Sequence, residues 1–292
     1  MTSLPGGNAL NALQSAYRPL VRRYTPETSP FSVVCVDVTH RCNMECANCF
    51  IPNRALPDFP TDELLALLRR FPRRIRVRLV GAEPTVREDL PELIRRVREL
   101  GHVPIVLTNG LKLGRRSYVT TLKRAGLRTL YLSMNGGLSD ELYEAMDGMA
   151  CAERKLLALS NATHDRMRVT VGMILARGIN EHHLAQFLQY LLARPRVTDI
   201  HLRSVGAIGR HLTGEPFTLN ELEIMLRDAL KDESRSLELP STVGSSRDFQ
   251  LGRVKVQLTE WPDLGSTSRG RLTPDGFVEP MFESIVSNDG SY

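Results

Sequence analysis

Strand-like and helix-like segments alternate along most of this 292-residue chain, and that alternation restricts its fold more than any other feature. Strict alternation predicts parallel strands joined by right-handed helical crossovers. Six such units are fewer than the eight of a closed barrel. We therefore predict an α/β fold, a partial (β/α)6 TIM-like barrel with its functional residues at the carboxyl ends of the strands. The predicted strands are residues 32–39, 74–80, 103–107, 129–134, 168–175 and 199–204.

Changes in composition divide the chain into three parts. Residues 1–30 contain four prolines and one short apolar patch, and are expected to form an arm lying on the core. Residues 31–235 contain the alternating segments and form the predicted barrel. A polar stretch at 232–248 is typical of a linker. Beyond it, a turn sequence inside 269–278 predicts a hairpin. We predict that residues 236–292 form an extension that closes the barrel.

Composition and charge limit the classes of protein that the chain can belong to. A hydrophobic fraction of 42% is ample for a core, but no apolar run is long enough for a transmembrane helix. The first residues lack a signal peptide, which predicts a cytoplasmic protein. An odd number of cysteines, five, argues against a disulfide framework. The net charge of +5 comes without a basic stripe interleaved with aromatics, so nucleic acid is not the expected partner.

Three cysteines, Cys42, Cys46 and Cys49, stand at the spacing C-x3-C-x2-C directly after the first predicted strand. Thiolates are soft ligands that suit iron–sulfur clusters or zinc. Either metal usually takes four protein ligands, and only three are grouped here. The shortage indicates a distant fourth ligand or a cluster iron that is open to another molecule. A zinc site, a redox pair with a bystander and a chance spacing are the alternatives.

The second predicted strand ends at Gly81-Ala82-Glu83-Pro84. A glycine at this position lets the backbone approach a ligand closely, and the proline stiffens the turn. Glu83 supplies negative charge and the neighbouring carbonyls supply acceptors, a combination that suits an ammonium group. The alternative is an ordinary turn between a strand and a helix.

Together the two motifs resemble those of the radical S-adenosylmethionine (radical SAM) superfamily. The sequence V-D-V-T-H-R-C-N-M-E-C-A-N-C-F is similar to that family's first strand and cluster loop, and the resemblance covers roughly residues 32–210. It implies that Cys42, Cys46 and Cys49 hold three irons of a [4Fe–4S] cluster. The fourth iron would then bind the amino and carboxylate groups of SAM, which accounts for the missing thiolate.

The resemblance also implies where SAM is held. Phe50 would present its backbone to the adenine, and the turn Gly81, Ala82 and Glu83 would receive the methionine ammonium. The commoner sequence of that turn in the family is Gly-Gly-Glu-Pro. The third and fourth strands end where the family contacts the methionyl part and the ribose, at Thr108, Asn109, Ser133 and Asn135. Arg177 or Arg203 is expected to pair with the SAM carboxylate.

The chemistry implied is reductive cleavage of SAM to a 5′-deoxyadenosyl radical, which takes hydrogen from a small-molecule or peptide substrate in a biosynthetic pathway. Such an enzyme needs a flavodoxin- or ferredoxin-like reductant. The sequence from Thr273 to Pro280 resembles the start of the cysteine-rich SPASM extension, but Met281 stands where a cysteine would follow. We therefore expect no cysteine-bound auxiliary cluster and a redox-neutral reaction, such as epimerisation, elimination, rearrangement or group transfer.

Four further residues are candidates for choosing the reaction. Asp37, Arg78 and His201 lie on predicted strands and are candidate substrate ligands; Arg78 is also a candidate partner of Asp37. Cys151 is a candidate hydrogen donor to a substrate radical, or else a small buried residue that begins a helix. Two alternatives to the whole interpretation stay open: a non-catalytic protein holding zinc or a redox-sensing iron–sulfur cluster, and an RNA-modifying radical SAM enzyme.

Overall fold

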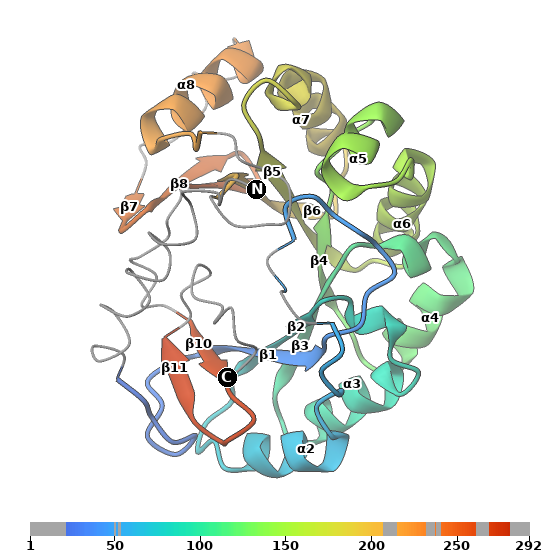
Figure 1. Cartoon of the computed structure of the whole chain (residues 1–292), viewed down its shortest axis with the longest axis vertical. Helices are drawn as coiled ribbons and strands as arrows, with labels where there is room; N and C mark the ends of the chain where they lie inside the picture. The colour runs from blue at the N-terminus through green and yellow to red at the C-terminus, as the bar shows by residue number, and fades with distance from the viewer. Residues whose placement is uncertain are drawn as a thin grey trace, which may run out of the picture.

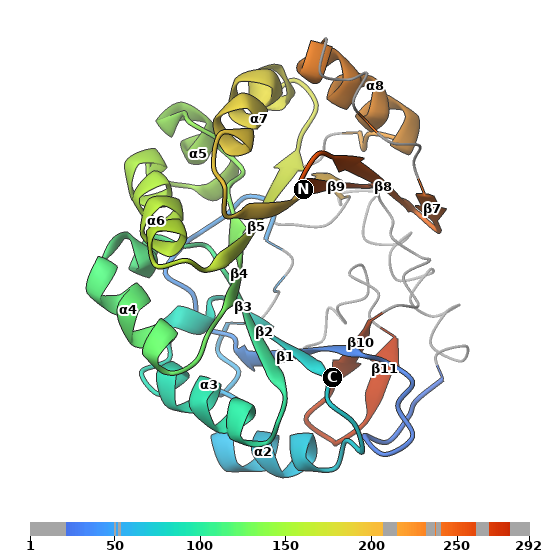
Figure 2. The ribbon, with the colours of Figure 1, turned by 180° about the vertical axis from the view of Figure 1, so that it is seen from behind.

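A single curved sheet organises the molecule. The computed structural model describes residues 22–49, 51, 54–206, 215–231, 237, 241–260 and 269–280. Within these ranges eleven strands form one sheet in the order β11-β10-β1-β2-β3-β4-β5-β6-β9-β8-β7. The helices cover its outer, convex side, and the two ends of the sheet face each other across an open interior (Figures 1 and 2).

The six central strands confirm the predicted partial barrel. Each of them is parallel to the next, as strands joined by helical crossovers must be. Their carboxyl ends therefore lie at the same edge of the sheet. The strands are β1 (Val33–Thr39), β2 (Arg76–Gly81), β3 (Val103–Thr108), β4 (Thr129–Ser133), β5 (Arg168–Leu175) and β6 (Val197–Ser204).

Local sequence signals fix several ends of the helices. Thr218 and Glu221 form the predicted capping box at the start of α8, because each side chain accepts a hydrogen bond from the other's backbone N–H. Ser139 caps α5, which ends at Gly148 with φ 77°. The helices are α2 (Thr61–Arg69), α3 (Leu90–Glu99), α4 (Arg116–Arg124), α5 (Asp140–Asp147), α6 (Ala152–His164), α7 (Leu184–Leu192) and α8 (Leu219–Leu230). Short 3-10 turns are η2 (Pro84–Val86), η3 (Leu111–Gly114) and η4 (Glu181–His183).

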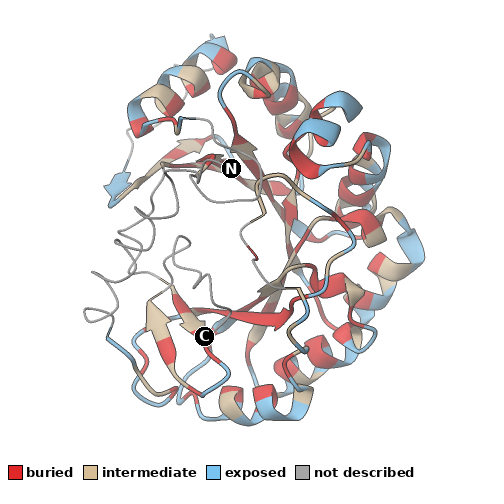
Figure 3. Ribbon diagram, viewed as in Figure 1, coloured by how far each residue is buried: buried red, intermediate tan, exposed pale blue. Residues whose placement is uncertain are grey.

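The hydrophobic core lies between the sheet and the helices. Val34, Val36 and Val38 of β1 are fully buried and face the same layer as Leu64 and Leu68 of α2. Figure 3 shows the burial of the strands and of the inner sides of the helices. Each fully buried aliphatic side chain contributes about 1.5–3 kcal/mol relative to an exposed one. Helix α2 is thereby fixed against β1, whose end carries the cysteine loop.

The last third of the chain supplies strands to both edges of the barrel. Strand β9 (Val254–Thr259) is parallel to β6, and β10 (Gly270–Leu272) is parallel to β1. Three antiparallel pairs complete the sheet: β7 (Ser241–Val243) with β8 (Ser246–Leu251), β8 with β9, and β10 with β11 (Val278–Pro280). The last of these is the hairpin that the sequence predicted.

The predicted linker at 232–248 is wrong over its second half, because residues 241–243 and 246–248 are strand. All three residues of β7 are exposed, so this hairpin has a polar sequence that resembles a linker. Most of the predicted N-terminal arm lies outside the described residues, and closure of the barrel by residues 236–292 stays a prediction. In the part of the chain that the structure describes, every helix is too short or too polar to cross a membrane.

Candidate active site

A cavity of about 570 Å³ lies on the inner face of the sheet, toward the carboxyl ends of the parallel strands. Strands β1 to β6 all contribute to its lining, as do β7 to β10. Most residues singled out in the sequence come together here. Those that line the cavity are Asp37, Cys42, Cys46, Cys49, Arg78, Gly81, Ala82, Thr108, Asn109, Ser133, Asn135, His201 and Arg203.

The three predicted cluster ligands, Cys42, Cys46 and Cys49, are half-buried free thiols on this cavity. Burial raises the pKa of the Cys42 and Cys46 thiols, so a metal must displace their protons in order to bind. Among the described residues, no group of three His, Cys, Asp or Glu is placed to hold one metal ion. The thiolates of a [4Fe–4S] cluster bind separate irons, so they need not converge on one point. The donor set therefore fits such a cluster.

The cysteine loop rests directly on the end of α5. The N–H of Ala47 donates to the carbonyl of Met146 over 3.1 Å. A side chain at Gly148, the next residue but one after Met146, would put its Cβ 2.6 Å from the carbonyl oxygen of Glu45. The glycine thus allows both the left-handed end of the helix and the close approach of the loop.

The turn after β2 is joined to the beginning of the cysteine loop. The N–H groups of Ala82 and Glu83 donate to the carbonyls of Thr39 and Arg41 over 2.9 and 3.1 Å. Gly81 has φ 123°, and a Cβ there would lie 2.2 Å from the Thr39 oxygen. Only glycine fits this approach. The two motifs recognised separately in the sequence therefore form one continuous wall of the cavity.

Glu83 differs from the sequence prediction in the direction of its side chain. It is fully buried and absent from the described cavity lining. Its carboxylate accepts from the N–H and hydroxyl of Thr85 (3.0 and 2.6 Å), the hydroxyl of Thr108 (2.7 Å) and the N–H of Asn109 (2.6 Å). Glu83 thus fixes the ends of β2 and β3 to each other. Within this turn, the lining residues Gly81 and Ala82 are better placed than the Glu83 carboxylate to receive an ammonium group.

A buried ion pair supports the end of β4. The ammonium of Lys155 lies 3.0 Å from the carboxylate of Asp147, and the two side chains are 0% and 1% exposed. Asp147 also accepts from the amide of Asn135 over 2.8 Å, and Lys155 donates to the Ser133 carbonyl over 3.0 Å. The Asn135 amide oxygen accepts from the N–H of Ile174. The pair therefore fixes Ser133, the last residue of β4, and Asn135, two residues beyond it, both of which the family resemblance singled out.

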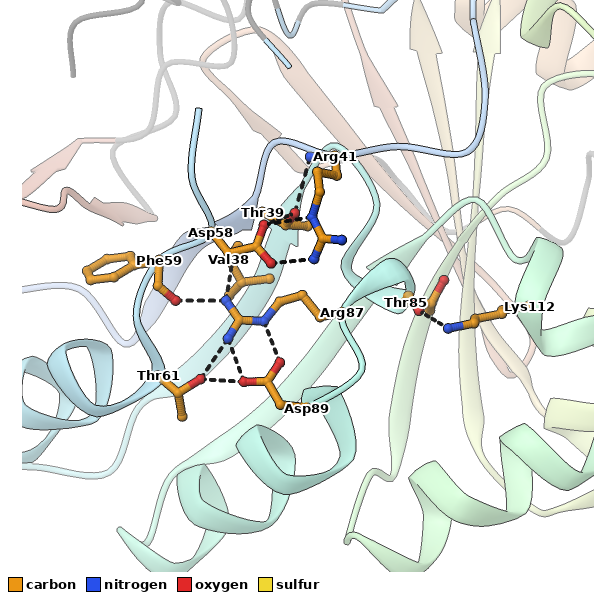
Figure 4. A network of polar contacts seen from close by, with 10 residues as sticks. All are labelled: Val38, Thr39, Arg41, Asp58, Phe59, Thr61, Thr85, Arg87, Asp89 and Lys112. Carbon is orange, nitrogen blue, oxygen red and sulfur yellow. Dashed lines mark hydrogen bonds and ion pairs between the residues drawn. The ribbon is translucent and has the colours of Figure 1, made fainter. Parts of the chain in front are cut away.

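A second network anchors the outer side of the cysteine loop (Figure 4). Arg87 is buried and donates to the carbonyls of Val38 and Phe59, each over 2.7 Å. It also contacts Asp89 and the hydroxyl of Thr61. One guanidinium thus joins the end of β1, the segment before α2 and the turn after β2.

The same network continues to the loop through Asp58. Its carboxylate accepts from the Thr39 hydroxyl over 2.6 Å and from Arg41 over 2.5 and 3.1 Å (Figure 4). Thr39 is the last residue of β1, so the start of the cysteine loop is held from its outer side as well as by the turn after β2.

The cavity is rich in positive charge. Among its described lining residues, seven carry cationic side chains and three carry carboxylates. Burial lowers the pKa of Arg269, and the nearby Arg78 and Arg203 lower it further. His201 is half-buried and lines the cavity. Burial and then Arg269, Arg78, Arg203 and Lys255 hold its pKa well below its usual value. His201 is therefore neutral at neutral pH, in a region that favours an anion.

The structure bears on two of the other predicted contacts, and a third is not described. The partner of Asp37 is Arg271 of β10, with Nε 2.7 Å from the carboxylate, whereas Arg78 lies over the ring of Tyr131. Arg177 pairs with Glu221 over 2.8 Å and is absent from the described lining, which leaves Arg203 as the candidate carboxylate partner. Phe50 lies outside the described residues.

Cys151 does not belong to the described lining of the cavity. It is buried at the start of α6, in an apolar cluster with Met44, Leu111 and Tyr143, and it packs behind Cys42 and Cys46. This placement favours the packing role of Cys151 over the hydrogen-donor role.

Sequence reasoning missed several lining residues. Asp147 and Lys155 lie on helical segments, where charged residues are ordinarily solvated, and no local signal marks them as a buried pair. Arg269 and Arg271 are two residues apart in the segment predicted as a hairpin, and this spacing could have indicated that both side chains lie on the same face of a strand. Their neighbour in the sheet, β1, is more than 200 residues away in sequence and could not have been identified.

Comparison with known proteins agrees with the geometry. The family model described as the radical SAM superfamily matches residues 36–191. The chain is 32% identical over 206 residues to 7,8-dihydro-6-hydroxymethylpterin dimethyltransferase of Methanocaldococcus jannaschii, which spans 67% of this chain and 40% of that protein. It is 31% identical over 167 residues to GTP 3′,8-cyclase of Limosilactobacillus fermentum, which spans 53% of this chain and 49% of the cyclase. The chain thus spans half or less of the length of these relatives.

The fold has a close counterpart among solved structures. Streptococcus suis SuiB bound to S-adenosylmethionine superposes with a TM-score of 0.68 at 13% identity, over 99% of this chain and 68% of SuiB. Because the family model covers more than half of the sequence, the chain belongs to the radical SAM superfamily, whose enzymes use a [4Fe–4S] cluster and S-adenosylmethionine.

Proposed function

We propose that Cys42, Cys46 and Cys49 hold the cluster, and that SAM binds along the wall formed by the cysteine loop and the turn after β2. The observation that carries this proposal is the joining of the two motifs, by the Ala82 to Thr39 hydrogen bond, on one cavity. When bound, cluster and SAM supply a 5′-deoxyadenosyl radical, which takes a hydrogen atom from a substrate carbon.

The residues of this chain bind and orient SAM. The backbone carbonyls at Gly81 and Ala82 receive the methionine ammonium, and Glu83 holds that turn against β3 from behind. Ser133 and Asn135 lie toward the ribose, held by the Asp147–Lys155 pair. Arg203 is the cation that we assign to the carboxylate. The walls exclude water from the reacting atoms.

The substrate is a small anionic molecule. Cationic side chains outnumber carboxylates by seven to three among the described lining residues, so the cavity favours an anion. A relative bears the name GTP 3′,8-cyclase, and GTP is a compact polyanion. These two observations favour a phosphorylated small molecule over a peptide as the substrate, with Arg78 and Arg269 contacting its phosphates; Lys255 is paired with Asp248 over 2.6 Å.

The reaction is redox-neutral overall. Outside the cysteine loop the sequence holds two cysteines, Cys35 and Cys151, and both are buried. Two thiols at separate places do not form the ligand set of an auxiliary cluster. Epimerisation, elimination, rearrangement and group transfer need no such cluster. A flavodoxin- or ferredoxin-like protein of the cytoplasm supplies the electron.

The deciding experiment is anaerobic reconstitution with iron and sulfide, then reduction with dithionite in the presence of SAM and an assay for 5′-deoxyadenosine. The control is the triple variant Cys42→Ala, Cys46→Ala, Cys49→Ala. We expect product from the wild type and none from the control. A fully loaded wild type that forms no product, with or without a panel of nucleoside triphosphates, would refute the proposal and favour a redox sensor.

A further inference from the structure

Arg54 occupies an unusual position next to the cysteine loop. It lies five residues after Cys49 in the sequence, and its side chain contacts the cysteine loop. This side chain is only 17% exposed and lines the cavity. Its Nε is buried and finds no hydrogen-bond partner among the described residues. Burying a guanidinium is costly, and such a placement needs compensating contacts.

Those contacts all go to the cysteine loop. Nη1 donates to the carbonyl of Met44 over 2.5 Å and lies 3.4 Å from the carboxylate of Glu45, which is 75% exposed. Nη2 donates to Sγ of Cys49 over 3.5 Å, an ordinary distance for a hydrogen bond to sulfur. One planar group therefore joins the backbone between the first two cysteines to the sulfur of the third.

We propose that Arg54 is a positioning residue for the cluster, which fixes Cys49 and raises the reduction potential of the bound cluster. This inference rests on the proposed function, because it requires Cys49 to hold an iron. Reduction by one electron adds negative charge, part of which the thiolates carry. A cationic donor to a thiolate stabilises that reduced state more than the oxidised state. Hydrogen bonds to cluster sulfurs are among the features that set cluster potentials.

The matched control is Arg41, a second arginine at the same loop. Its side chain is 56% exposed and pairs with Asp58. The sulfur contact of Cys49 belongs to Arg54. Replacing Arg41 by methionine removes the same charge from the same loop but leaves that contact in place. Its loss is screened by water, whereas the loss of Arg54 takes place beside the sulfur.

The test is an anaerobic redox titration of the full chain, monitored through the EPR signal of the reduced cluster. We compare wild type, Arg54→Met, Arg54→Lys and Arg41→Met at equal iron content. At the wild-type midpoint, the ratio of reduced to oxidised cluster should fall about tenfold in Arg54→Met, which is about 59 mV for one electron. The midpoint potential of Arg54→Lys should lie between those of the wild type and Arg54→Met. Lysine keeps the charge but lacks the planar group that contacts both the Met44 carbonyl and the Cys49 sulfur. Arg41→Met should titrate as the wild type does.

An unchanged titration of iron-loaded Arg54→Met overturns the inference, as does an equal shift in Arg41→Met. If Arg54→Met retains no iron, the midpoint of Arg54→Lys decides: a lower value supports the inference and the wild-type value overturns it. Wild-type iron content and 5′-deoxyadenosine formation are measured first. Their failure removes the proposed function, whereas unchanged Arg54 variants of an active enzyme remove this inference alone.

Discussion

The buried pair of Asp147 and Lys155 gives the sharpest test of how the active-site wall is held. Replacing Lys155 by methionine shortens the unbranched side chain by one atom and leaves a carboxylate that is 1% exposed with the Asn135 amide as its donor. Removing one partner of a buried pair costs about 3–5 kcal/mol. At about 2–4 °C per kcal/mol for a chain of this size, the apparent Tm should fall by roughly 6–20 °C.

The double variant separates pairing from packing. If Asp147→Asn and Lys155→Met each leave an uncompensated charge, the variant carrying both leaves none, and it should lose about 2 kcal/mol less than the two single losses added together. Thermal unfolding followed by circular dichroism measures all four proteins. The pair of Glu92 and Arg95, about half exposed on each side, is the control, and Glu92→Gln should leave the apparent Tm unchanged because solvent screens this pair. Additive losses in the double variant would refute the reasoning.

Three further outcomes follow from the same contacts. Gly81→Ala should lose most of its iron and its SAM binding, measured by iron content and equilibrium dialysis, because a Cβ would lie 2.2 Å from the Thr39 oxygen; wild-type loading would contradict this. The folded-state pKa of His201 lies well below its ordinary 6.5, so below about pH 6.5 only the unfolded chain takes up the proton and the free energy of unfolding should fall. The midpoint of denaturant unfolding, measured against pH, should show this fall in the wild type and a smaller one in His201→Gln. Arg269→Met should weaken binding of a nucleoside triphosphate and make the remaining affinity less sensitive to salt, as titration at two salt concentrations would show; an unchanged salt dependence would exclude Arg269 from the anion site.

The sequence predicted features that depend on neighbouring residues. The β-branched runs such as Val33–Thr39 marked the central strands, and the capping residues Thr218 and Glu221 marked the start of α8. The two motifs could be placed on adjacent loops because parallel strands bring their carboxyl ends to one edge. That rule, applied to the order of the strands in the sequence, is enough to locate most of the cavity lining.

Other features depend on contacts that no local pattern reports. The position of Glu83 followed from its motif, but the direction of its carboxylate depends on donors from the end of β3, 25 and 26 residues away. Arg271 meets Asp37 across 234 residues. Arg177 and Arg203 looked equivalent as candidate carboxylate partners, and only the packing of α8 against the turn after β5 separates them, since Glu221 pairs with Arg177.

The pairing of β10 with β1 has a consequence for biosynthesis. As the chain leaves the ribosome, β1 is made early, yet its outer neighbour is complete only when residue 272 has been added. Until then one edge of β1 has unpaired N–H and C=O groups, a template for association with other chains. Long-range pairing of this kind forms slowly. The strand that leads into the cysteine loop therefore gains its second neighbour only after residue 272 has been made.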